Sequence, residues 1–161
     1  MGLHILRRAC ETGAITAGEP IAEATSGNTG ISFAAIGRSL GHPVTVFMPD
    51  WMSAERIALI SSFGASVVLV SKADGGFLGS IGRADAMKAA NHRTFLPHQF
   101  SNTANIEAHA TGTGPEIGKQ LAAAGLPRAS FVAGVGTGGT VMGVGRFLKS
   151  KHPSVRVHPL E

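Results

Sequence analysis

Short apolar runs alternate with helical patterns along this chain, and this alternation restricts the possible folds more than any other feature. Three runs of four or five residues are bounded by turn residues and are typical of buried strands: Val44–Met48, Val67–Val70 and Phe131–Val135. Between the runs, apolar residues recur three and four positions apart, as they do over residues 33–40, which predicts amphipathic helices. The strand-helix-strand order predicts an α/β fold with mostly parallel sheets covered by helices.

The same patterns predict the remaining elements. We expect helices over residues 3–12, 28–40, 54–63, 80–91, 103–124 and 138–149, and further strands at 21–24 and from 155 onward. Whether the helix at 103–124 is continuous in its middle is left undecided by Gly112, Gly114 and Pro115. The last strand reaches the C-terminus with no helix to cover it, so we expect a piece of a larger α/β protein.

The composition is that of a folded chain, and it does not indicate a nucleic-acid partner. Of 161 residues, 43% are hydrophobic and 15% are charged, which is enough apolar material for a core. The net charge of +4 is mild and the basic residues are scattered, so no nucleic-acid partner is expected. Cys10 is the only cysteine and is predicted to be a buried or half-buried small hydrophobe.

Metal and membrane functions are not expected either. The seven histidines include no pair four residues apart, and the acidic residues do not cluster, so no metal site is expected. No apolar run approaches the roughly 18 residues that a membrane helix needs. The N-terminal residues do not have a signal-peptide pattern, so we expect a soluble, cytoplasmic protein.

The segment Thr25-Ser26-Gly27-Asn28-Thr29-Gly30 separates a strand from a helix and contributes little apolar surface. It presents backbone N–H groups and short polar side chains where a helix begins, which is a suitable place for an anion. The alternative is a group of helix caps without any ligand, because Ser, Thr and Asn are common caps.

A second segment of this kind follows about 110 positions later, at Gly136-Thr137-Gly138-Gly139-Thr140. Two hydroxyls beside a helix start suit a terminal phosphate with its acceptor oxygens. Two alternatives stay open. Gly134–Gly139 also matches G-x-G-x-x-G, and Glu161 lies near the place of a ribose-binding acid, as in a dinucleotide site. The glycines could also form a tight turn and bind nothing.

The segment Glu23–Gly30 resembles the substrate loop of the cysteine synthase and cystathionine β-synthase family, which are pyridoxal phosphate enzymes of fold type II. Further blocks match that family in order, and together they extend over essentially the whole chain: Pro49–Arg56 with Phe63-Gly64-Ala65, Pro97–Asn102 followed by Thr111–Ile117, and Gly134–Gly145. The resemblance implies a two-lobed, three-layer αβα fold of the tryptophan synthase β-subunit type, and it favours pyridoxal phosphate over a dinucleotide.

The resemblance also implies roles for individual residues. The cofactor phosphate would be held by Gly136, Thr137, Gly138, Gly139 and Thr140. Asn28 would bond the cofactor's ring hydroxyl. The amino-acid carboxylate would be held by Thr25, Ser26, Gly27, Thr29 and Gln99. The implied reaction is β-replacement, in which an activated serine and a sulfur donor form cysteine.

One expected residue is missing. The family's Schiff-base lysine lies on the helix before the substrate loop, but the first lysine of this chain is Lys72. We therefore expect a chain truncated at both ends, with residues 1–96 as the N-terminally truncated small lobe and 97–161 as the first part of the large lobe. The resemblance implies a homodimer. Whether this chain alone is an enzyme stays open: the alternatives are an inactive fragment or pseudo-enzyme that binds pyridoxal phosphate or an amino acid, and a serine or threonine eliminase of the same fold.

Overall fold

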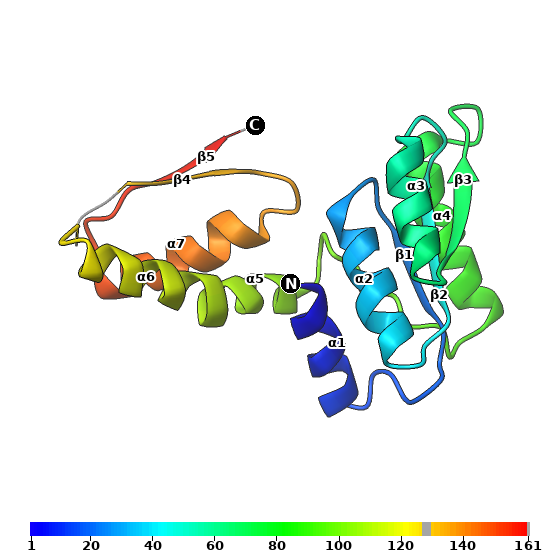
Figure 1. Ribbon diagram of the computed structural model, residues 1–161, viewed down its shortest axis with the longest axis horizontal. Helices are drawn as coiled ribbons and strands as arrows, with labels where there is room; N and C mark the ends of the chain where they lie inside the picture. The colour runs from blue at the N-terminus through cyan, green and yellow to red at the C-terminus, as the bar shows by residue number, and fades with distance from the viewer. Residues whose placement is uncertain (127–129, 161) are drawn as a thin grey trace. The chain divides into compact units, whose positions relative to one another are not determined.

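The computed structural model describes residues 1–126 and 130–160, and within them the chain forms two compact units (Figure 1). The N-terminal unit comprises Gly2 and Leu6–His98. The C-terminal unit comprises Met1, Leu3–Ile5 and the chain from Gln99 to its end. Glu161, which entered the dinucleotide interpretation, lies outside the described residues.

The N-terminal unit is built on a parallel sheet. Its strands, in spatial order, are β1 (Ile21–Ala24), β2 (Val44–Pro49) and β3 (Ser66–Val70). The register aligns Ile21 with Val44 and Val46 with Val67. A parallel bridge from Ile21 to Phe95 extends the sheet beyond β1. β2 and β3 lie at the predicted apolar runs 44–48 and 67–70 to within one residue, and β1 lies at the strand predicted for 21–24.

Helices cover both faces of this sheet. On one face, α2 (Asn28–Ser39) and α3 (Ala54–Ser62) contact each other and the strands. The helix α4 (Gly76–Ala90) contacts all three strands and, among the described residues, neither of those helices. Figure 1 shows the strands between α2 and α4. The unit is therefore a three-layer αβα arrangement, as predicted.

The side chains of successive strand residues point to opposite faces of the sheet. Phe47 of β2 packs with Ala22 of β1 and Ala84 of α4 in one buried cluster. Its neighbour Val46 is fully buried and lies next to Gly30 of α2. This alternation is the normal consequence of the period of two in a strand. It explains why the parallel strands are apolar on both sides.

The first helix, α1 (Gly2–Glu11), buries one stripe of residues, namely Gly2, Ile5, Leu6 and Ala9. Cys10 is exposed, so the prediction that it is buried or half-buried was wrong. The physical reason is its place outside the stripe: in the last turn of α1 it lies about 100° around the helix from Ala9, on the outer side of Leu6.

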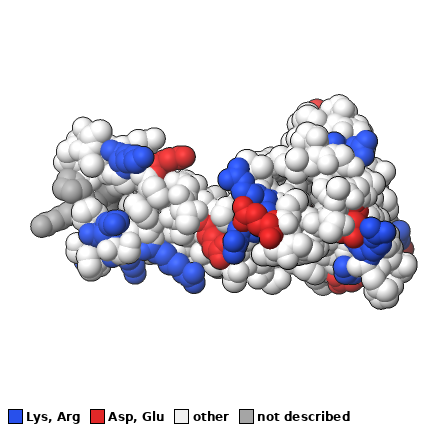
Figure 2. Space-filling view, turned by 90° about the horizontal axis from the view of Figure 1, so that it is seen from below, with Lys and Arg blue, Asp and Glu red and all other residues white. Residues whose placement is uncertain are grey.

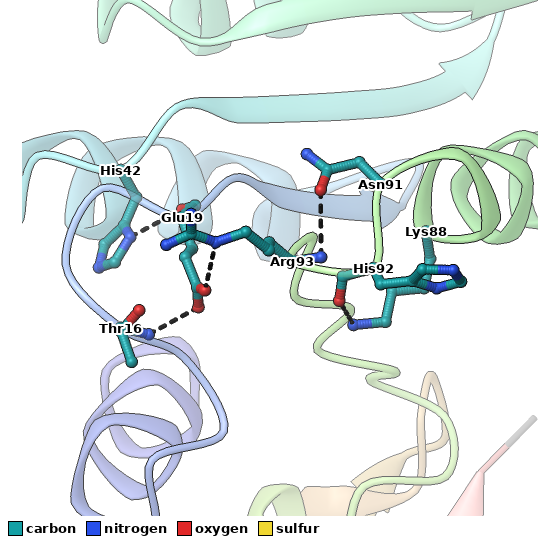
Figure 3. A network of polar contacts seen from close by, with 7 residues as sticks. All are labelled: Thr16, Glu19, His42, Lys88, Asn91, His92 and Arg93. Carbon is teal, nitrogen blue, oxygen red and sulfur yellow. Dashed lines mark hydrogen bonds and ion pairs between the residues drawn. The ribbon is translucent and has the colours of Figure 1, made fainter.

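A polar network fixes the segment that leads into β1 (Figure 3). The Glu19 carboxylate accepts hydrogen bonds from the Thr16 backbone N–H at 2.8 Å and from Arg93 Nε at 3.1 Å. His42 Nδ1 lies 2.9 Å from the Glu19 carbonyl oxygen. These contacts hold the residues just before Ile21 in place, and β1 leads directly into the loop at 25–30.

The C-terminal unit has a parallel pair of strands with one helix packed on them, and the other described helical segments of the unit contact that helix. Its elements are α5 (Thr103–Ala108), a π-helical turn (His109–Thr113), α6 (Gly114–Ala123), β4 (Phe131–Gly134), α7 (Gly139–Lys151) and β5 (Val157–Leu160). The buried residues Val144, Leu148 and Val155 form its core. The helix expected at 103–124 is thus divided by a π-helical turn, and the last strand begins two residues later than expected.

Candidate functional site

The loop at Thr25–Gly30 begins where β1 ends and continues into the first turn of α2. Gly27 occupies the N-cap of α2, and no side chain caps this helix. The alternative of a purely capping role for Ser, Thr and Asn is therefore not what the structure shows. Instead, Thr25 Oγ1 accepts the Gly27 N–H at 3.1 Å, which shapes the loop just before the helix.

Thr25 and Gly30, the two ends of the loop, are buried, whereas the residues between them reach the surface. Thr25 is 3% exposed, and its methyl group lies under Gly30, where a Cβ atom would collide with it. Ser26 and Asn28 are exposed, and Thr29 is partly exposed. The loop therefore offers an amide, two hydroxyls and the first N–H groups of a helix to a ligand, while Thr25 supports it from beneath.

Arg56 of α3 is a residue that the sequence reasoning did not assign to the site. Its Nη1 donates a hydrogen bond of 2.7 Å to the carbonyl oxygen of Ser26. A charged donor to a carbonyl oxygen is stronger than a neutral one, so this contact ties the loop to α3. The two residues are 30 positions apart, and no local pattern in the sequence signals the contact.

The second loop, Gly136–Thr140, has the same arrangement in the C-terminal unit. It follows β4 and enters α7, whose N-cap is Gly138 with φ of 79° and no side-chain cap. A left-handed residue at this point favours glycine. Cβ atoms placed on Gly136 or Gly138 would meet open space. The backbone N–H groups at the start of α7 are thus accessible to an anion.

Asn105 of α5 joins two of the predicted site residues. Its Nδ2 donates to Thr137 Oγ1 at 2.8 Å and to the Gln99 carbonyl oxygen at 3.0 Å. Asn105 is 3% exposed and Gln99 is 4% exposed. The C-terminal unit therefore brings Gln99 and Thr137 together through one buried amide, which sequence reasoning missed.

His109, in the π-helical turn, makes the corresponding contact to the other threonine of the loop. Its Nε2 lies 3.3 Å from Thr140 Oγ1, and its Nδ1 lies 3.0 Å from Thr113 Oγ1. Burial lowers the pKa of His109, and the positive amino group of Met1 acts in the same direction. These effects favour the neutral ring. π-Helical turns are frequent at functional sites.

Two glycines of α7 let these side chains approach the loop. A Cβ on Gly139 would collide with the Asn105 side chain. A Cβ on Gly143 would collide with the backbone around Ile106 and with His109. The pair at 139 and 143 and the pair at 105 and 109 each have a spacing of four, so each pair lies on one helical face.

The predicted residues thus fall into two groups, one in each unit. Thr25, Ser26, Gly27, Asn28 and Thr29 belong to the N-terminal unit, and Gln99 with Gly136–Thr140 belongs to the C-terminal unit. Within each group the residues are in local contact or adjacent in the chain.

Other kinds of site are not supported. Among the described residues, no group of three or more His, Cys, Asp or Glu side chains could hold a metal ion. No helix in the described ranges is long and apolar enough to cross a membrane. Figure 2 shows Lys and Arg side chains dispersed over one face, with acidic residues between some of them. On this face the described residues do not form the basic stripe of a nucleic-acid site.

Comparison with known proteins identifies the family. The family model described as "pyridoxal-phosphate dependent enzyme" matches residues 1–161. The chain belongs to this family. A probable cysteine synthase from Bacillus subtilis is 40% identical over 151 residues, which cover 94% of this chain and 48% of that protein. The chain therefore spans about half the length of the curated relatives it matches.

Solved structures of the family have the same fold. A hydrogen sulfide-producing enzyme from Fusobacterium nucleatum is similar with a TM-score of 0.97 at 52% identity, covering 100% of this chain and 48% of that one. A cysteine synthase from Entamoeba histolytica is similar with a TM-score of 0.89 at 33% identity, covering 99% of this chain and 46% of that one. The predicted resemblance and fold class are confirmed.

Pyridoxal phosphate is the cofactor of this family, which confirms the cofactor prediction and sets the dinucleotide interpretation aside. The chemistry of the second loop fits its phosphate group. Hydroxyls and helix N–H groups offer donors to an acceptor-only anion. In addition, the sequence contains no Asp or Glu between Glu116 and Glu161, so no carboxylate from this stretch opposes an anion there.

Proposed function

We propose that this chain contributes the substrate loop and the cofactor-phosphate loop of an enzyme that catalyses β-replacement on an activated serine, forming cysteine with a sulfur donor. The observation that carries the proposal is that two helices, α2 and α7, begin at glycines with no side-chain cap. Each offers helix N–H groups and threonine hydroxyls to an anion. Cysteine synthases at 39–40% identity support this reaction class.

The proposed roles follow the chemistry of each loop. Gly136–Thr140 would hold the cofactor phosphate at the start of α7. Asn28, an exposed amide in the first turn of α2, would donate to the ring hydroxyl of the cofactor. The substrate carboxylate would be held by Thr25, Ser26, Gly27, Thr29 and Gln99.

Each group has a distinct task in the reaction. When bound, the cofactor supplies an electron sink for the α-carbon of the amino acid. Ser26 and Thr29 orient the carboxylate by hydrogen bonding, and the start of α2 favours its negative charge. Thr25 keeps the loop closed through its bond to the Gly27 N–H. Arg56 keeps the loop on α3 through Ser26. Fixed geometry of this kind lowers the entropic barrier of the reaction.

The proposal includes the organisation of the molecule. The N-terminal unit would belong to the small lobe and the C-terminal unit to the first part of the large lobe, near the boundaries 1–96 and 97–161. Cytoplasmic location and homodimer formation stay predictions.

The test compares this chain with an extended protein, where the gene encodes further residues on either side. We expect the extended protein to form cysteine from O-acetylserine and sulfide. We expect the 161-residue chain to bind pyridoxal phosphate without turnover, because it has no lysine before Lys72. An extended protein that binds the cofactor and forms no cysteine would contradict the proposal and favour a pseudo-enzyme.

One observation favours a second reaction. The Fusobacterium nucleatum enzyme at 52% identity is hydrogen sulfide-producing. The same loops would then serve the release of sulfide from a sulfur-containing amino acid rather than its incorporation. Measuring sulfide release from cysteine and cysteine formation in parallel, on the same extended protein, distinguishes the two. Ammonia and a keto acid formed from serine or threonine would indicate an eliminase instead.

A further inference from the structure

We infer that Asn105 and His109 are positioning residues that turn the hydroxyl protons of Thr137 and Thr140 away from the protein, toward a ligand that only accepts hydrogen bonds. The inference rests on the proposed function in one respect: it takes Gly136–Thr140 as the loop for the cofactor phosphate. It adds residues from a different helix and a reason for phosphate selectivity.

The first step concerns the polarity of the Asn105 contact. A side-chain amide nitrogen can only donate, so the bond of 2.8 Å from Asn105 Nδ2 makes Thr137 Oγ1 an acceptor. The second hydrogen of the same nitrogen goes to the Gln99 carbonyl oxygen at 3.0 Å, which fixes the orientation of the amide. Thr137 must therefore direct its own proton elsewhere.

The second step concerns His109. A neutral imidazole has one donor nitrogen and one acceptor nitrogen. If Thr113 donates to Nδ1 across their 3.0 Å contact, Nε2 carries the proton and donates to Thr140 Oγ1 at 3.3 Å. Thr140 then has the same polarity as Thr137. The π-helical turn, His109–Thr113, brings the Thr113 hydroxyl to Nδ1 of the His109 ring, while Nε2 of the same ring contacts the Thr140 hydroxyl.

The third step is the packing that holds both contacts. Asn105 and His109 lie four residues apart and face Gly139 and Gly143, which are also four residues apart. A side chain at residue 139 would displace the Asn105 side chain, and one at residue 143 would push the neighbouring backbone away from α7. The contacts to both threonines are therefore held by the packing of α7 against α5 and the π-helical turn.

The consequence is that the side chains and backbone groups named here face the ligand as donors. Two outward hydroxyl protons join the free N–H groups at the start of α7. A phosphate, which has three acceptor oxygens, satisfies all of them. A hydroxyl or a protonated group in its place would leave donors unpaired, which costs binding free energy. The loop should therefore select the phosphorylated ligand.

The test uses the 161-residue chain and two probes, pyridoxamine phosphate and pyridoxamine. Neither probe has an aldehyde, so neither reacts with lysines, and they differ only in the phosphate. We expect the wild-type chain to bind the phosphorylated probe at least tenfold more tightly, measured by calorimetry. Asn105→Asp should remove most of this preference, because a carboxylate accepts the Thr137 proton and repels the phosphate. Asn105→Ala should lower the preference for the phosphorylated probe about tenfold, which is the effect of weakening one hydrogen bond to a charged group.

His109 is tested by a matched pair of variants. His109→Gln can keep a donor near the position of Nε2, whereas His109→Phe keeps the ring shape and removes the donor. We expect the glutamine variant to retain more of the phosphate preference than the phenylalanine variant. A loss of packing alone would weaken both probes equally and leave their ratio unchanged, and that result would overturn the inference.

Nuclear magnetic resonance of the unliganded wild-type chain provides a measurement that does not depend on any variant folding. The nitrogen shifts of His109 should show a proton on Nε2 and none on Nδ1. The opposite tautomer would overturn the role of His109.

A wild-type chain without preference for the phosphorylated probe would overturn the whole inference. The two proposals can also fail separately. If the phosphate preference is present and depends on Asn105, but the extended protein forms no cysteine, only the proposed function is overturned.

Discussion

Gly82 and Gly143 both lie inside helices but have opposite surroundings. A Cβ on Gly143 would collide with the backbone of the neighbouring α5 and π-helical segment, whereas a Cβ on Gly82, exposed on α4, would meet nothing. We expect Gly143→Ala to destabilise the chain by about 2 kcal/mol through overpacking. We expect Gly82→Ala to stabilise it by about 0.5–1 kcal/mol, because alanine favours a helix. Thermal unfolding measures both, and shifts of the same sign would contradict the packing described for α7.

His98 has a left-handed backbone conformation, with φ of 50°, that a β-branched residue rarely adopts. It is exposed, so the backbone rather than side-chain packing decides its tolerance. We expect His98→Val to cost about 1–2 kcal/mol and His98→Asn to be near neutral, because asparagine tolerates this region. Urea unfolding of the two variants tests the difference. If valine and asparagine behave alike, the strain at residue 98 is not significant.

At the scale of elements, the start of β1 depends on an ionised Glu19. The hydrogen bond from Thr16 and the bond from Arg93 lower the pKa of Glu19. A lowered pKa in the folded state adds stability above the unfolded value of about 4.3, and this stability is lost as the pH falls through the folded value. The melting temperatures of the wild type and Glu19→Gln should therefore differ at pH 7 and converge below about pH 4.

Glu11 offers a matched control for that experiment. Its carboxylate lies 3.5 Å from Arg8 in an exposed pair on α1. Exposed pairs of this kind contribute little to stability. Glu11→Gln should leave the melting temperature almost unchanged across the same pH range. A change as large as that of Glu19→Gln would indicate a general charge effect rather than the network at β1.

Elements with clear periodicity were predictable from the sequence, and those determined by tertiary contacts were not. The strands β1 and β2 begin at the predicted residues, Ile21 and Val44, because strands buried on both faces are mostly apolar between turn residues. By contrast, α4 begins at Gly76, four residues before the expected start. Its first turn has glycines at 75, 76 and 79, which indicate a loop by propensity. A Cβ on Gly76 would collide with Trp51, a contact that no local pattern contains.

At the scale of the whole molecule, the two loops were predictable because glycines and hydroxyls at a strand-to-helix junction have a local signature. The residues that support these loops could not be predicted from the sequence. Asn105 acts on Thr137 across 32 positions, and Arg56 acts on Ser26 across 30. Each is an ordinary polar residue on a predicted helix. Only the folded structure shows that it is aimed at a loop.

The five lysines determine how the whole chain should react with pyridoxal phosphate. Lys88 is partly exposed, and the others, Lys72, Lys119, Lys149 and Lys151, are fully exposed on helices or loops. A lysine that forms a specific covalent bond with a cofactor is normally set apart by burial or by its neighbours. We therefore expect borohydride reduction in the presence of pyridoxal phosphate to label several lysines weakly. Peptide mass spectrometry measures the distribution, and heavy labelling of one lysine would show that this chain contains a covalent cofactor site of its own.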